Sequence, residues 1–165
     1  MNEETPMPAN LARHDAPNFT EKTFYLEEFY GKSILFALVP PSGERLPELD
    51  WLVLTLRQLL RNQTRCIVIA SHQSLPRIVR RLGRMLRHPP AHFNPATGLR
   101  TRPYPPDSAV AEIWHGLRHG SLVVAAAETE DPEDLVVFAQ ELASRLRVFK
   151  LVMLDRAGGL TDAND

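Results

Sequence analysis

RCIVIASHQSLPRIVRRLGRMLR, residues 65–87, contains the change of hydrophobic period that decides the fold. Its first seven residues are apolar almost throughout, which is typical of a strand buried on both faces. From Leu75 to Arg87 the apolar residues instead recur at helical spacing, and Ser74 stands where an N-cap is expected. The stretch therefore predicts a buried strand followed by a helix. The predicted inner face of that helix consists of Ile78, Val79, Leu82, Met85 and Leu86.

The same alternation runs through the rest of the chain. Further strands are predicted at SILFALV (Ser33–Val39), SLVVAAA (Ser121–Ala127) and FKLVMLD (Phe149–Asp155). Further helices are predicted from about Pro47 to Arg61, from Asp107 or Ser108 to Leu117, with Gly120 ending it, and from Pro132 to about Arg147. The segment 88–107 carries six of the fourteen prolines and is expected to be irregular. This pattern predicts an α/β fold, a three-layer αβα sandwich whose mainly parallel sheet has about four or more strands.

Composition limits the classes of protein that the chain can belong to. The 165 residues carry 19 basic and 20 acidic side chains, a net charge of −1, so nothing global indicates nucleic acid or a membrane surface. The one cysteine, Cys66, lies inside an apolar run, as expected of a buried thiol in a reducing compartment. No apolar stretch is long enough to span a bilayer, and the start lacks the apolar core of a secretory signal. We expect a cytoplasmic protein with an N-terminal arm at residues 1–22 and one domain at residues 23–165.

Three stretches of the chain resemble the amino acid kinase family, in particular acetylglutamate kinase and the kinase-like domain of N-acetylglutamate synthase. FYLEEFYGKSILFALV (24–39) is similar to the family's helical lead-in, Gly-Lys pair and first strand. DSAVAEIWHGLRHGSLVVAAAE (107–128) is similar to its unit of helix, glycine and strand. ELASRLRVFKLVMLDRAGGLTDAND (141–165) is similar to the segment that closes its amino-acid-binding lobe. The resemblance implies an amino-acid-kinase-like lobe that lacks the nucleotide-binding lobe.

The chain departs from that family at the positions that handle phosphate. Ala37 matches the family's lysine, and Val39-Pro40 replace its paired glycines; proline has no amide N–H to offer a phosphate. Residues 71–74, Ser-His-Gln-Ser, replace a second glycine turn, and the family's Asn-x-Asp signature is not kept near Asp134 and Val136.

The resemblance with these departures implies a catalytically degenerate domain that acts as a binding, regulatory or assembly module linked to arginine biosynthesis, with no cofactor. The alternative is an acetylglutamate-kinase-like phosphotransferase whose ATP lobe lies outside this sequence. Either the sequence is a piece of a longer protein or it is a natural short form, and the resemblance leaves both open.

Ligand-binding candidates lie where strands of an open α/β sheet end. Ser71, His72 and Ser74 follow the strand 65–71, where such sheets bind ligands, so a small amino-acid-like ligand or an anion is one interpretation and a plain cap and turn is the other. Gly158 and Gly159 form a glycine turn after the last predicted strand and are the second candidate. A serine next to a histidine also suggests a nucleophile and its base, but neighbours on a turn rarely point at each other, and no G-x-S-x-G motif is present.

Two surfaces are candidates for interactions with other proteins. Five arginines fall on one face of the helix 75–87, opposite its apolar stripe; they are Arg77, Arg80, Arg81, Arg84 and Arg87. We call them the arginine ridge. It suits an acidic protein partner, or it is a solvated face paired with the acidic run at 128–134; without interleaved aromatic residues, nucleic acid is disfavoured.

Trp51 and Leu54 lie on the side of the helix 47–61 away from its leucine stripe, which indicates either burial between two layers or association into a homo-oligomer. His115 and His119, spaced i, i+4, are the one candidate metal pair. Gly116 and Gly120 indicate that the helix frays there, so the sequence favours two surface histidines and predicts no metal site.

Overall fold

The computed structural model describes residues 21–39, 49–86, 93–95, 107–120 and 122–154. Its strands are β1 (Ser33–Leu38), β2 (Arg65–Ser71), β3 (Phe93–Pro95), β4 (Leu122–Ala127) and β5 (Lys150–Leu154). Its helices are α1 (Glu21–Phe29), α2 (Asp50–Arg61), α3 (Leu75–Met85), α4 (Asp107–His119) and α5 (Pro132–Leu146). The four long strands coincide with the four apolar runs, so the predicted α/β fold is confirmed.

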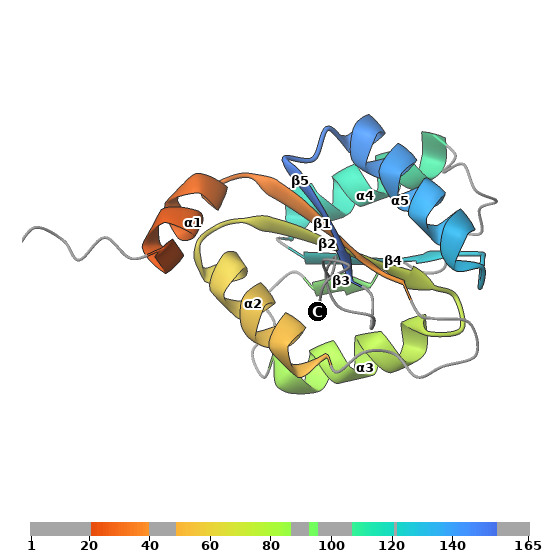
Figure 1. Ribbon diagram of the computed structural model, residues 1–165, viewed down its shortest axis with the longest axis horizontal. Coiled ribbons are helices and arrows are strands. Elements are labelled where there is room, and N and C mark those ends of the chain that lie inside the picture. The colour runs from red at the N-terminus through yellow and green to blue at the C-terminus, as the bar shows by residue number, and fades with distance from the viewer. Residues whose placement is uncertain (1–20, 40–48, 87–92, 96–106, 121, 155–165) are drawn as a thin grey trace, which may run out of the picture.

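The strands form one sheet in the order β3-β4-β2-β1-β5, and every pair is parallel. Because all strands run the same way, their carboxyl ends lie at one edge of the sheet, to the right in Figure 1. The helices that follow β1 and β2 cover one face, and those that precede β4 and β5 cover the other. Right-handed crossovers require this division, since the chain moves outward from β1 to β3 and then returns toward β5.

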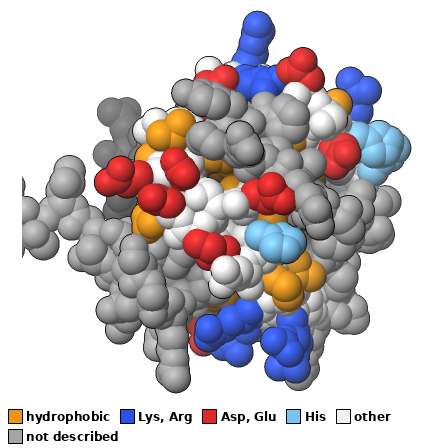
Figure 2. Space-filling view, turned by 90° about the vertical axis from the view of Figure 1, so that its right-hand side faces the viewer, with side chains coloured by type: hydrophobic (Ala, Val, Ile, Leu, Met, Phe, Trp, Pro, Cys, Tyr) orange, Lys and Arg blue, Asp and Glu red, His pale blue; other side chains and the backbone are white. Residues whose placement is uncertain are grey.

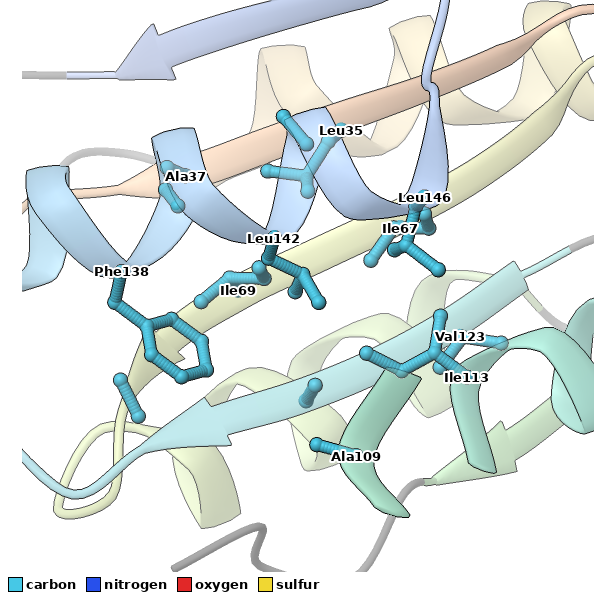
Figure 3. Packing of buried hydrophobic residues seen from close by; sticks show 14 of the residues in the cluster. Leu35, Ala37, Ile67, Ile69, Ala109, Ile113, Val123, Phe138, Leu142 and Leu146 are labelled. Carbon is cyan, nitrogen blue, oxygen red and sulfur yellow. The ribbon is translucent and has the colours of Figure 1, made fainter. Parts of the chain in front are cut away.

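Alternation along each strand produces two separate cores. Leu35, Ile67 and Val123 face the layer of α4 and α5, whereas Ile34, Cys66 and Leu122 face α2 and α3. Figure 3 shows the first core, in which residues of the sheet meet Phe138, Leu142 and Leu146 of α5 and Ala109 and Ile113 of α4. Burial on both faces explains why these strands read as continuous apolar runs.

The structure departs from the sequence predictions at three places. The segment 88–107, predicted to be irregular, contains the three-residue strand β3 at the edge of the sheet. Helix α1 begins at Glu21, two residues inside the predicted arm. Helix α4 runs on to His119 instead of fraying after Leu117, since Gly116 lies inside the helix and packs against the sheet. Within the described ranges, none of the helices is long and apolar enough to cross a membrane.

Candidate functional site

The candidate site lies where β2 and β4 end next to each other. Ser71 and Ala127 are register partners, so the two strands stop at the same level. From this point β2 leads to α3 on one face of the sheet, and β4 leads to α5 on the other. Neighbouring parallel strands whose connections leave on opposite faces open a crevice, which is the usual ligand position in α/β sheets. The predicted residues Ser71, His72 and Ser74 lie at this position.

A tight turn holds the end of β2. The backbone N–H of His72 donates to the Ala127 carbonyl (2.9 Å), and the N–H of Ser74 donates to the Ser71 carbonyl (3.1 Å). The buried Ser71 hydroxyl donates to the Ser74 hydroxyl over 3.0 Å, while His72 is exposed. The Ser71 hydroxyl is therefore bonded to a second serine.

Ser74 precedes α3 as predicted but makes no capping bond. Its backbone is helical, with φ −79° and ψ −25°, and no side-chain cap hydrogen bond is formed. A serine caps when its backbone is extended and its oxygen faces the first helical N–H groups. Here the hydroxyl meets Ser71 instead.

The anion position in front of α3 holds a carboxylate from another part of the chain. Oε1 of Glu130 accepts a hydrogen bond from the backbone N–H of Gln73 over 3.2 Å. Negative charge is favoured at this position because the partial positive charge of a helix lies at its amino end. The sequence did not predict this contact between Glu130 and the turn that precedes α3. No sequence signal identifies it, because the two segments meet only through the strand order.

The start of α5 adds further negative charge to the same edge. Asp131 has an extended backbone and caps α5, accepting a hydrogen bond from the N–H of Glu133 over 2.8 Å. The Thr129 hydroxyl accepts from the N–H of Asp131 (3.0 Å) and donates to Asp134 (3.4 Å). Figure 2 shows several acidic side chains across the middle of the face at the carboxyl edge, with basic side chains along its lower rim and others at its top. This arrangement favours an ammonium or guanidinium group over a phosphate.

The described residues at the end of β1, up to Val39, show no group that is free to bind a phosphate. The Ala37 side chain is fully buried in the core beneath α5. The backbone N–H of Val39 donates to the Leu154 carbonyl of β5 over 3.0 Å. The Val39 N–H, the last described amide of this strand end, is therefore already hydrogen-bonded to β5.

The four described members of the arginine ridge are exposed on α3; they are Arg77, Arg80, Arg81 and Arg84. Arg81 contacts Asp50 at the start of α2 over 2.5 Å. Arg81 therefore pairs with the start of α2 and not with the acidic run at 128–134. Arg87, like Gly158 and Gly159, lies outside the described residues.

Trp51 and Leu54 are 46% and 56% exposed, so the interpretation that they are buried between layers is wrong. His115 and His119 lie side by side on α4 with ring centroids 4.4 Å apart. Across the described ranges, no three His, Cys, Asp or Glu side chains come together in a group that could hold a metal ion.

Comparison of the chain with protein-family profiles, with curated protein sequences and with solved structures gives no match.

Proposed function

We propose that this chain is a binding module without phosphotransfer chemistry, which receives a small amino-acid-like ligand with a cationic group at the switch point between β2 and β4. The observation that carries the proposal is the Glu130 carboxylate on the amino end of α3. Its contact with the Gln73 N–H places negative charge beside the polar turn at Ser71 and His72, where it disfavours a phosphate. An amino acid such as arginine offers an ammonium and a guanidinium group to such an edge.

The proposal agrees with the resemblance to the amino acid kinase family and with the departures from it. Phosphoryl transfer depends on cations and backbone amides that are arranged around the phosphates. The position that matches the family's lysine is the buried Ala37, and the Val39 amide is bonded to β5. A lobe with that ancestry and without those groups keeps the capacity to bind an amino acid and loses the capacity to activate a phosphate.

The test is isothermal titration of the 165-residue chain with arginine, N-acetylglutamate and Mg-ATP. We expect arginine to bind and the two anions to bind at least tenfold more weakly. Glu130→Gln should weaken arginine binding, because it removes the charge and keeps the shape of the side chain. Glu112→Gln, on the exposed side of α4, is the matched control and should bind as the wild type does.

Two results would overturn the proposal. Failure of arginine to bind at millimolar concentration, or binding that Glu130→Gln leaves unchanged, would remove the switch point as a site for a cationic amino acid. Turnover of Mg-ATP with N-acetylglutamate would instead support the alternative phosphotransferase.

A further inference from the structure

A concave surface lies at the amino edge of the sheet, opposite the candidate site, where α1 rests beside the last turns of α2. It is a groove of about 350 Å³. Leu26 and Phe29 of α1 and the buried Leu59 of α2 supply its apolar surface. Thr55 and Gln58 line it along α2, and their positions one turn from Trp51 and Leu54 connect the groove with the exposed side of that helix. The volume is that of a small-molecule site.

Hydrogen bonds fix the wall of the groove that α1 forms. The Thr64 hydroxyl donates to the Phe29 carbonyl over 2.8 Å, and the Asn62 side-chain amide donates to the Leu26 carbonyl. The Tyr30 hydroxyl donates to the Gln63 side chain over 3.1 Å. Asn62, Gln63 and Thr64 belong to the turn between α2 and β2. The carboxyl end of α1 is therefore fixed to the elements that form the rest of the groove. A preformed concavity binds a ligand without the cost of ordering its walls.

The charge of the groove has one sign. Lys150, the first residue of β5, lines it with its ammonium nitrogen 5.5 Å from the centre of the Phe29 ring. No Asp or Glu is among the residues that line the groove, and the described part of the chain shows no ion pair to Lys150. The remaining polar groups are neutral; they are the Tyr25 hydroxyl, the Thr55 hydroxyl and the Gln58 amide. An apolar surface with a single cation is complementary to an apolar molecule with a single negative end.

We propose that the groove between α1 and α2 binds a small amphipathic carboxylate, with an aromatic or aliphatic body on Leu26, Phe29 and Leu59 and the carboxylate on Lys150. Gln58 lines the same groove, and its amide N–H group can donate a second hydrogen bond to a carboxylate. The site is separate from the proposed amino-acid site, because it lies at the other edge of the sheet and has the opposite charge. The groove therefore selects a ligand with an apolar body and a negative end, whereas the carboxyl edge selects a positively charged ligand.

The experiment titrates the 165-residue chain with 1-naphthoate and, as the uncharged match, 1-naphthalenemethanol. We expect naphthoate to bind and the alcohol to bind at least tenfold more weakly, since a charge-assisted hydrogen bond is lost. Lys150→Gln should weaken the binding of naphthoate by roughly tenfold or more and leave the binding of the alcohol unchanged. Lys32→Gln is the matched control: Lys32 lies 4.5 Å from the centre of the Phe149 ring in the same aromatic cluster but does not line the groove.

Thr55→Trp fills the groove and should abolish the binding of both probes, with a thermal melt to show that the variant is folded. Equal binding of naphthoate to the wild type and Lys150→Gln would overturn the assignment of the carboxylate, and failure of both probes to bind at millimolar concentration would overturn the site. If the wild type is a dimer that Thr55→Trp converts to a monomer, the groove is occupied by a second copy, and the small-molecule proposal is wrong.

Discussion

Gly116 and Gly83 should respond in opposite ways to replacement by alanine. Both lie inside helices, but a Cβ at Gly116 would lie 2.8 Å from Cγ2 of Val123, and a Cβ at Gly83 would have nothing within 4 Å. Neither has a positive φ. The glycine in α4 therefore permits a close approach to β4, whereas the glycine in α3 faces open space.

The magnitude follows from two terms. Replacing an interior helical glycine with alanine stabilises a helix by about 1 kcal/mol, and this term is common to both positions. Forcing a methyl group into a packed core costs about 1–3 kcal/mol, and Val123 cannot easily yield because a valine is restricted to few rotamers. We expect Gly83→Ala to stabilise the protein by about 0.5–1 kcal/mol and Gly116→Ala to be about 1–3 kcal/mol worse than Gly83→Ala.

The assay is urea unfolding followed by circular dichroism, with the midpoint and the slope fitted separately. A double-mutant cycle with Val123→Ala isolates the contact, because the residue that clashes is then truncated. In that background Gly116→Ala should regain the stabilisation seen at Gly83. If Gly116→Ala stabilises the wild-type chain as much as Gly83→Ala does, α4 does not pack on β4 as closely as described, and the reasoning fails.

Five further outcomes are expected. Burial raises the pKa of the Cys66 thiol to about 12, so Ellman's reagent at pH 8 should label it only as fast as the protein unfolds, and labelling at the rate of a free thiol would contradict this. Because that pKa is raised above its ordinary value of 9.0, the Cys66 contribution to stability should decline as pH rises from about 9 toward about 12, and Cys66→Ala should show a flatter alkaline decline in urea unfolding. Asp131→Ala should lower the unfolding free energy by about 1 kcal/mol through loss of the α5 cap, and an unchanged urea midpoint would argue against that cap. Sedimentation velocity should show that the wild type self-associates and that Trp51→Glu is a monomer; if both are monomers, association through α2 is refuted. The double variant Arg80→Glu/Arg84→Glu should no longer bind an acidic partner in a pull-down, and its melting temperature should change little. A large drop in melting temperature would instead indicate an internal ion-pair network.

The layers of the fold are predictable from the sequence because each long strand is apolar on both faces. Such a run requires a covering layer on each side, and four of them alternating with helical periods leave few arrangements other than a parallel three-layer sandwich. Strand β3 was missed for a physical reason: it is three residues long and contains Pro95, whose missing N–H is tolerated at the edge of a sheet. The prolines of that segment predict irregular structure, and a strand of three residues is too short to give a pattern that would change this prediction.

The glycine at position 116 was misinterpreted for a related reason. A glycine near a helix end usually predicts termination, since it is a poor helix former. Here its lack of a side chain allows α4 to lie against Val123, and that packing offsets the lower helix propensity. Only the three-dimensional contact distinguishes a glycine that ends a helix from one that brings a helix close to a sheet.

In the candidate site, too, the residues next to a strand end are predictable from the sequence, whereas a residue brought there from a distant segment is not. Ser71, His72 and Ser74 were found because the end of a buried strand is a local feature of the sequence. Glu130 was not found, because it lies 57 residues beyond Gln73 and their contact depends on β4 lying next to β2. Strand order is set by the crossover connections, and one of these contains the segment that the sequence marks as irregular.

The two edges of the sheet differ in charge because different segments end there. At the carboxyl edge the loop before α5 brings Glu130 and Asp131 beside the end of β2, and no described lysine or arginine pairs with either of them. At the amino edge Lys32 and Lys150 lie over aromatic rings at the starts of β1 and β5. The carboxyl edge therefore favours a positively charged ligand group, and the amino edge favours a negatively charged one. The two proposed sites are therefore separated by the length of the strands, and substitutions at Glu130 and Lys150 should affect the two ligands independently.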